Sequence, residues 1–289
     1  MQFLKFFLSG LGNLFKNLEF TKASIIEADR LGFDGAVMPD HYMWGTRNWG
    51  RGPDDYVTLE TWMTLTYLAA KTENIQLGTL VTPIPFRPPT IFAKMLSTLD
   101  VLSNGRVVLG VGAGWSREEF EGYSEWNDPK IRIDKTEEGL ELMIQLWTQK
   151  EVTFQGKYYH AKAAVLEPKP VQKPYPQLLF GGSGKRMLKL AGKYADICFI
   201  PPFSQTPDFY EKGKAIVLEA AEKAHRRDKI AFMAGDMGTQ GPFSTKGCSR
   251  RIEAAINAGA SYFLISFPHS ENRTALMKEF AKEVVPSYE

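Results

Sequence analysis

A carboxylate, an imidazole and an indole follow one another closely after a short apolar segment. The segment Gly35–Met38 has the composition of a buried strand, and it leads into Asp40, His41 and Trp44. A histidine exchanges protons near neutral pH, a neighbouring carboxylate tunes it, and an indole offers a flat wall for a planar ring. The cluster indicates proton transfer beside a ring-shaped ligand. An Asp-capped turn with a surface histidine is the alternative.

A second segment that suits a site, Leu77–Pro89, lies at the end of the third apolar run. Gly78 and Thr79 are followed within a few residues by several prolines. Prolines fix φ and remove amide donors, so the composition predicts an irregular, rigid turn after the strand. Such a turn shapes a binding site or is simply a stiff connection, and the segment alone favours neither.

Two glycine-rich segments follow later apolar runs, and glycine lets the backbone approach a ligand closely. In Gly110–Trp115 the Gly-x-Gly pattern lacks the third glycine and the acidic residue of a dinucleotide fingerprint. Gly181–Arg186 precedes a predicted helix, where amide groups, glycines and two cations together predict a phosphate-binding site. Close loop packing and a tight strand-to-helix connection are the respective alternatives.

The candidate segments must be positioned by strands and helices, and the rest of the chain predicts a regular series of both. Short apolar runs alternate with amphipathic windows, which is the pattern of parallel βα units. The predicted strands are Phe3–Leu8, Gly35–Met38, Ile75–Thr79, Arg106–Gly110, Leu178–Gly181, Asp196–Ile200, Ile230–Ala234 and Tyr262–Ser266. The predicted helices are Leu18–Leu31, Asp54–Lys71, Pro89–Ser103, Ile133–Thr148, Lys185–Tyr194, Pro207–Arg226, Ser244–Ala258 and Asn272–Val285. The alternation predicts one (β/α)8 TIM barrel domain over residues 1–289, with a doubly wound open sheet as the alternative.

One segment interrupts this alternation between the fourth helix and the fifth strand. Glu151–Pro176 contains alternating residues around Gly156 and then a proline-rich run. We expect a small β-hairpin followed by an extended loop. Because active sites of such barrels lie at the C-terminal ends of the strands, the residues after each strand are the functional candidates.

The composition of the chain limits which binding partners are expected. The chain has 35 Lys and Arg against 33 Asp and Glu, and a net charge of +2 argues for neither nucleic acid nor membrane. Met1–Leu8 is interpreted as a strand rather than a signal peptide, and no stretch reaches the roughly 20 apolar residues of a membrane span. The four histidines show no metal-ligand spacing, so no metal is expected. Cys198 and Cys248 are interpreted as buried thiols of a cytoplasmic protein.

Together these segments resemble the luciferase-like family of flavin- and deazaflavin-dependent oxidoreductases over nearly the whole chain. The most specific part is Leu77–Trp115, in which Thr98–Arg106 leads into Gly110–Trp115. Gly156–Tyr159 and Pro168–Gln172 are also similar to the family. Within it, the chain looks most like the branch that uses the hydroxy-deazaflavin coenzyme F420.

The resemblance implies how the chemistry is divided among the candidates. Asp40 contacts the deazaflavin ring, with His41 beside it as proton donor and Trp44 as a wall of the substrate pocket. In the hydride-transfer hypothesis that these roles suggest, Asp40 also orients His41. The family's bulge after the third strand supports the back of the ring and matches Leu80, Val81 and Thr82. It contains a non-prolyl cis peptide, which we place at Leu80–Val81.

The resemblance also assigns residues to the rest of the cofactor and to the substrate. The cofactor's side chain is bordered by Ala113, Gly114 and Glu118, and its phosphate is held by Gly181, Gly182, Gly184 and Lys185. The substrate pocket is lined by Trp44 and Trp115, and His269 is a further candidate for its lining because it follows the eighth strand at the active rim. Trp115 stands where sugar-phosphate dehydrogenases of this branch carry a glutamate, and the region between the seventh strand and the eighth helix is short, without their basic residues.

The leading hypothesis is therefore an F420-dependent oxidoreductase that transfers a hydride to or from a small organic substrate. A monooxygenase that uses FMN and a separate reductase is the first alternative, and a non-catalytic cofactor-binding homologue is the second. The resemblance further implies a homodimer packed through outer helices. The aromatic-rich segment Trp62–Tyr67 suits such a face, and burial of that segment against the barrel is the alternative.

Overall fold

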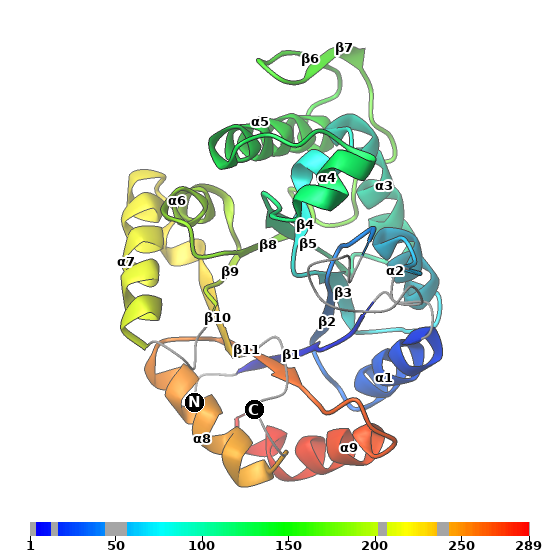
Figure 1. Cartoon of the computed structure of the whole chain (residues 1–289), viewed down its shortest axis with the longest axis vertical. Helices are drawn as coiled ribbons and strands as arrows, with labels where there is room; N and C mark the ends of the chain where they lie inside the picture. The colour runs from blue at the N-terminus through cyan, green and yellow to red at the C-terminus, as the bar shows by residue number, and fades with distance from the viewer. Residues whose placement is uncertain (1–3, 13–16, 44–56, 202–206, 236–242, 289) are drawn as a thin grey trace.

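The computed structural model describes residues 4–12, 17–43, 57–201, 207–235 and 243–288. In these residues, parallel strands form a closed ring surrounded by helices (Figure 1). The strand order around the ring is β3-β2-β1-β11-β10-β9-β8-β5, and pairing of β3 with β5 closes it. The prediction of a (β/α)8 barrel is confirmed, and an open sheet is excluded.

Each ring strand lies within two residues of its predicted bounds at both ends. The strands are β1 (Lys5–Ser9), β2 (Gly35–Met38), β3 (Gln76–Thr79), β5 (Val107–Gly112), β8 (Gln177–Gly181), β9 (Ile197–Phe199), β10 (Ala231–Gly235) and β11 (Tyr262–Ser266). The additional strands are β4 (Thr82–Pro83), which pairs with β5, and the hairpin strands β6 (Val152–Gln155) and β7 (His160–Ala164).

The helices occupy the intervals between the strands. They are α1 (Leu18–Arg30), α2 (Thr61–Ala69), α3 (Pro89–Leu102), α4 (Arg117–Tyr123), α5 (Pro129–Thr148), α6 (Lys185–Tyr194), α7 (Pro207–Lys223), α8 (Thr245–Asn257) and α9 (Arg273–Glu283). Short 3-10 turns are η4 (Ile84–Phe86), η5 (Arg227–Lys229) and η6 (Val285–Ser287). Among the helices in the described ranges, none is both long and apolar enough to cross a membrane.

Alternation along the strands divides the core in two. On β1, Phe6 and Leu8 belong to the large cluster that packs the strands against the helices, whereas Phe7 belongs to a smaller one. The smaller cluster draws side chains from most of the ring and fills its interior: Phe7, Val37, Val108, Leu179, Ile197, Phe199, Met233, Tyr262 and Leu264. Gly78 of β3 leaves room for this cluster, because a Cβ there would lie 2.1 Å from the carbonyl oxygen of Val108.

Three predicted helix bounds are wrong by three or more residues. Capping explains two of them. The third is the end of the sixth predicted helix, which lies at Lys223 rather than Arg226, and His225 beyond it has a φ of 54°. The second helix begins at Thr61 rather than near Asp54, since the Glu60 carboxylate accepts from the Met63 amide at 2.6 Å and fixes the start there. Residues 54–56 lie outside the described residues. The fourth predicted helix begins at Pro129, before Ile133, because the Asp128 side chain accepts from the Ile131 amide at 3.0 Å.

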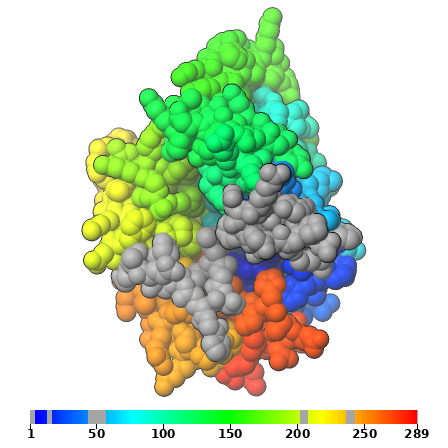
Figure 2. All heavy atoms as spheres, viewed as in Figure 1, coloured from blue at the N-terminus to red at the C-terminus, as the bar shows by residue number. Residues whose placement is uncertain are grey.

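The segment between α5 and β8 carries the hairpin β6–β7, which projects beyond α5 at the top of Figure 1. Its turn is held by Glu138 of α5, whose carboxylate accepts from the amides of Lys157, Tyr158 and Tyr159 at 2.7–2.9 Å. The helix α4 had no counterpart in the prediction. In Figure 1 it lies toward the viewer, beside α3 and α5, and the face of the molecule seen in this view is drawn with all atoms in Figure 2.

Candidate active site

An irregular bulge follows β3, and its Leu80–Val81 peptide bond is cis, as predicted. Two glycines pack against it. A Cβ at Gly112 would lie 2.4 Å from Cγ2 of Val81, and one at Gly181 would lie 2.8 Å from Cγ1 of the same residue. The bulge therefore requires glycine at the ends of two strands, β5 and β8, and close packing accounts for part of both glycine-rich motifs.

Asp40 lies behind this bulge, and its side chain is fully buried. Arg87 donates to both carboxylate oxygens, at 2.7 and 3.0 Å, and the Thr82 hydroxyl donates to Oδ2 at 2.7 Å. The expectation that Asp40 orients His41 is therefore wrong, because both oxygens face Arg87 and Thr82 instead. The carboxylate ties the end of β2 to the bulge.

Arg87 extends this network to the start of α2, where it also pairs with the Glu60 carboxylate. Its guanidinium lies 5.0 Å from the centre of the Tyr42 ring. Burial alone would lower the pKa of Arg87, but the charge of Asp40, with its hydrogen bonds, outweighs burial and raises that pKa. Arg87 therefore stays charged although it is largely buried, and it is hydrogen-bonded to the buried Asp40 side chain.

His41 is oriented by Glu119 of α4, a residue that the sequence analysis did not single out. Nδ1 of His41 lies 2.7 Å from Oε2 of Glu119. Oε1 accepts from the backbone amides of Tyr42 and Met43, at 2.7 and 3.0 Å. Only 1% of the Glu119 side chain is exposed, against 13% for His41. The carboxylate thus fixes both the ring and the backbone that carries it.

The pKa of Glu119 is lowered. Burial by itself would raise it, but the hydrogen bond and charge of His41 and the amides of Met43 and Tyr42 outweigh burial. One sequence signal pointed to this residue: Ser116 is followed by Glu119 in the Ser-x-x-Glu spacing of a helix start. Ser116 is indeed the N-cap residue of α4, although its side chain makes no capping hydrogen bond.

Trp115 lies at the mouth of the site, with 59% of its surface exposed. Its ring meets His41 edge to face, with the ring centres 5.8 Å apart. Trp44, the other predicted aromatic wall, lies outside the described residues.

The predicted phosphate segment is exposed at the start of α6. Gly184 is the N-cap residue, it has no side chain to accept from the first helical amides, and a Cβ there would meet nothing within 4 Å. Gly182 has a φ of 147°, a conformation that favours glycine. Lys185 is exposed, whereas Arg186 pairs with Asp134 of α5. Open space, helical amides and one cation meet at this point.

The residues expected beside the cofactor's side chain differ in burial and in their capacity for hydrogen bonding. Ala113 is half-buried, and Gly114 has a φ of 75° and faces inward, because a Cβ there would lie 2.5 Å from the Phe120 ring. Glu118 is half-buried, and its Oε2 atom is buried without a hydrogen-bond partner among the described residues. That oxygen is an acceptor suited to a ligand's hydroxyl group.

His269 follows β11, near the start of α1. Its Nε2 lies 2.7 Å from the Gly10 carbonyl oxygen, and its ring stacks on Phe20 with the centres 4.7 Å apart. Burial, together with the charge of Arg273, lowers the pKa of His269 against the opposing effect of the Gly10 hydrogen bond. The imidazole is therefore tied to the β1 side of the ring.

The predicted segments converge on the bulge. Val81 contacts the positions of Gly112 and Gly181, and Thr82 binds Asp40. His41, next to Asp40, meets both Trp115 and Glu119 from the β5–α4 segment. Elements β2, β3, β5 and β8 thus bring their C-terminal ends to one place. In the described residues no cluster of three or more His, Cys, Asp or Glu side chains is arranged to hold a metal ion.

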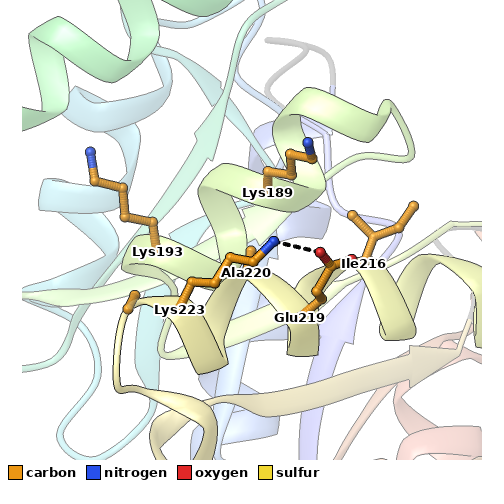
Figure 3. A pocket seen from close by; sticks show the side chains of 7 residues that line it. Lys189, Lys193, Ile216, Glu219, Ala220 and Lys223 are labelled. Atoms are coloured by element: carbon orange, nitrogen blue, oxygen red, sulfur yellow. Dashed lines mark hydrogen bonds and ion pairs between the residues drawn. The ribbon is translucent and has the colours of Figure 1, made fainter.

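A groove between the outer helices α6 and α7 is a separate feature (Figure 3). It is lined by Lys189, Lys193, Ile216, Glu219, Ala220, Lys223 and Ala224. Lys223 pairs with Glu219 at 2.6 Å, and Lys193 pairs with Glu137 and Glu141 of α5. Since carboxylates offset much of its charge, this groove is not a match for an anionic ligand.

Comparison with known proteins gives a consistent picture. The sequence profile of the family described as luciferase-like monooxygenase matches residues 1–237. An F420-dependent glucose-6-phosphate dehydrogenase of Microbacterium testaceum is 32% identical over 206 residues, which cover 70% of this chain and 59% of that protein. An FMNH(2)-dependent dimethylsulfone monooxygenase of Pseudomonas putida is 32% identical over 133 residues, 46% of this chain and 36% of that protein. The chain thus spans less than two thirds of the length of these relatives.

Among solved structures, an F420-dependent secondary alcohol dehydrogenase in complex with an F420-acetone adduct superposes with a TM-score of 0.83. The alignment covers 100% of both chains at 21% sequence identity. At this identity the similarity establishes the shared fold.

Proposed function

This chain belongs to the luciferase-like monooxygenase family, and we propose that it is an oxidoreductase that transfers a hydride between the deazaflavin coenzyme F420 and a small organic substrate. The observation that carries the proposal is the pair His41–Glu119, a histidine held by a buried carboxylate next to the bulge. The names of relatives 32–34% identical to the chain support F420 as the cofactor.

The described residues fit the shape of such a cofactor. We place the deazaflavin ring against the bulge Leu80, Val81 and Thr82, where Leu80 and Val81 are half-buried and Thr82 is fully buried behind them. Asp40 supports this surface from behind through Thr82 rather than touching the ring. When bound there, the deazaflavin supplies or accepts a hydride.

The remaining parts of the cofactor have matching groups nearby. Gly181, Gly182, Gly184 and Lys185 hold its phosphate, because the start of α6 offers amides, space and a cation. Ala113, Gly114 and Glu118 would border its hydroxylated side chain, where the buried Oε2 of Glu118, which has no hydrogen-bond partner among the described residues, would accept from a hydroxyl group.

His41 handles the proton that accompanies the hydride. Trp115, whose ring meets the imidazole edge to face, would line the substrate pocket together with His269. An indole at position 115 offers neither a charge nor a proton acceptor, so we propose a small neutral substrate rather than a sugar phosphate.

Titration of the purified protein with F420 and with FMN, followed by fluorescence, tests the proposal. We expect F420 to bind more tightly than about 100 μM, or about 5.5 kcal/mol, and more tightly than FMN. Weaker binding of F420, or a preference for FMN, contradicts it.

A second candidate activity is favoured by the similarity to the FMNH(2)-dependent monooxygenase of Pseudomonas putida. In that case the partner is a separate reductase that delivers reduced FMN, and oxygen is a substrate. Oxygen uptake that depends on both FMN and an added flavin reductase, with no turnover on F420, establishes this alternative.

We also propose a homodimer that packs through α2. Its Trp62 and Leu65 side chains are buried against the barrel, whereas Met63 and Tyr67 are 64% and 43% exposed on the opposite side. These two apolar side chains line a groove that a second copy would cover. Light scattering of the protein with Met63→Glu tests the dimer, since a charge in the interface should yield monomers.

We also propose a cytoplasmic location, which is supported by the buried thiols of Cys198 and Cys248, neither of which forms a disulfide.

A further inference from the structure

We propose that Glu119 is a positioning residue that keeps the His41 proton on Nδ1, so that Nε2 is the atom that exchanges a proton with the substrate. The identity of the substrate rests on the proposed function, but the state of the imidazole does not.

The contacts of Glu119 determine which group is the donor in its hydrogen bond with His41. Two of its three partners are the backbone amides of Tyr42 and Met43, which only donate. Both approach Oε1, so Oε2 is left facing Nδ1 of His41 at 2.7 Å. With a lowered pKa, Glu119 is ionised near neutral pH, and an ionised carboxylate has no proton to give. The hydrogen bond therefore runs from Nδ1 to Oε2.

This assignment fixes the chemistry of the second nitrogen. A neutral imidazole carries one proton, and with that proton on Nδ1 the lone pair is on Nε2. A protonated imidazole carries both, and its charge then lies beside the buried Glu119 carboxylate. The ring gains and loses its proton at Nε2 without turning, as the histidine of a carboxylate–histidine pair does in general.

The proposed reaction is balanced with this arrangement. If the substrate is a carbonyl compound, reduced deazaflavin would supply a hydride to the carbonyl carbon and would itself be oxidised by two electrons. The C=O π bond opens, and the oxygen takes the Nε2 proton of His41. The product is an alcohol, and the neutral imidazole keeps its proton on Nδ1, which donates it in a hydrogen bond to Oε2 of Glu119. In the oxidising direction, the alcohol oxygen returns its proton to Nε2.

The neighbouring carboxylate does not provide this function. Asp40 has both oxygens bound by Arg87 and Thr82. A purely structural role for Glu119, in which it serves only the amides of Tyr42 and Met43, is the competing explanation. The variant Glu119→Gln separates the two. Its amide oxygen still accepts from the backbone, but its NH2 group then donates toward Nδ1 and forces the His41 proton onto Nε2.

The experiment is ¹⁵N NMR of the ligand-free 289-residue chain with labelled imidazole nitrogens, at neutral pH. The chain has four histidines, so His41 is assigned from the signal lost in His41→Gln. We expect the neutral His41 ring to carry its proton on Nδ1 in the wild type and in Glu119→Asp, and on Nε2 in Glu119→Gln. Glu121→Gln is the matched control, since Glu121 lies on the same helix, pairs with Arg117 and is exposed.

An Nε2 proton in the wild type overturns the proposal, and so does an unchanged proton position in folded Glu119→Gln. If Glu119→Gln fails to fold, the wild-type and Glu119→Asp spectra decide. With an identified substrate, kcat of Glu119→Gln should fall about 10- to 100-fold with little change in KM, and that of Glu121→Gln should not change. Absence of any F420-dependent turnover contradicts the proposed function but leaves the NMR result valid.

Discussion

Gly181, the last residue of β8, lies so close to Val81 that a methyl group at its Cβ position would be 2.8 Å from Cγ1 of that valine. The same valine limits Gly112 at the end of β5, where the corresponding distance is 2.4 Å. The bulge after β3 is thus shaped by residues about 30 and 100 positions away. Glycines that look like ligand-binding residues in the sequence first serve packing against this bulge.

Gly181→Ala should destabilise the protein by about 1–3 kcal/mol, because the added methyl group displaces Val81. The double variant Gly181→Ala with Val81→Ala should recover a large part of this loss, since the second change removes the atom in conflict. Gly184→Ala is the control for stability, as nothing lies within 4 Å of its Cβ position. Urea unfolding is measured for five proteins: the wild type, the single variants Gly181→Ala and Val81→Ala, their double variant, and Gly184→Ala. Additive effects of the two changes would show that Val81 is not the limiting contact.

Asp40→Ala should cost about 3–5 kcal/mol, because it leaves the buried Arg87 guanidinium without its bidentate partner. The exposed pair Arg117–Glu121 provides the comparison, and Glu121→Ala there should cost less than about 1 kcal/mol. Denaturant unfolding at neutral pH gives both values. Equal losses in the two variants would mean that the buried pair is no stronger than a surface one.

The pH dependence of stability should carry the signature of Glu119. Its folded-state pKa is lowered, chiefly by His41 and two amides acting against burial, so the unfolded chain binds the proton more readily. The resulting stability is complete above the unfolded-state pKa of about 4.3 and is lost as pH falls through the folded-state value. The stability difference between wild type and Glu119→Gln should therefore shrink between pH 6 and pH 3. A difference that stays constant would contradict the assignment.

The strands of the barrel were predictable from the sequence, because a buried parallel strand appears there as a continuous run of apolar residues. The interior residues of β1 and β5, such as Phe7 and Val108, need no long-range information to be recognised. Glu119 was not predictable in this way, since it lies 78 positions from His41 and sits on a seven-residue helix too short for a clear apolar period. The role of Asp40 was misjudged for a related reason. Asp40 turns toward Thr82 while its neighbour His41 turns toward Glu119, and adjacency in the sequence does not show which way each side chain points.

His41→Ala should lower kcat by about 10²- to 10⁴-fold, the usual contribution of a positioned acid–base group. Binding of F420 should change less than about threefold, because the bulge and the start of α6 remain intact. Steady-state kinetics and a fluorescence titration on the same preparation give both numbers. Unchanged turnover would remove the proton-transfer role of His41, and tight cofactor binding by a wild type that has no activity on any substrate would support a non-catalytic binding protein.

Lys185→Ala should weaken binding of the phosphorylated cofactor about tenfold, the effect of losing one charge-assisted hydrogen bond. Lys185 is exposed at the first position of α6, next to the open space around Gly184. Its neighbour Arg186 provides the matched control, because its guanidinium is engaged by Asp134 and the Lys130 carbonyl of α5. Arg186→Ala should therefore leave the affinity within about twofold.

The decisive comparison uses a deazaflavin that lacks the phosphate. If Lys185 contacts the phosphate, Lys185→Ala binds this truncated compound as well as the wild type does, and the loss of affinity appears only with the complete cofactor. Equal weakening for both compounds would place Lys185 against another part of the ligand or show an indirect effect on the fold. No weakening for either would leave the helix amides of α6 as the phosphate-binding groups, since Gly184 offers no side chain of its own.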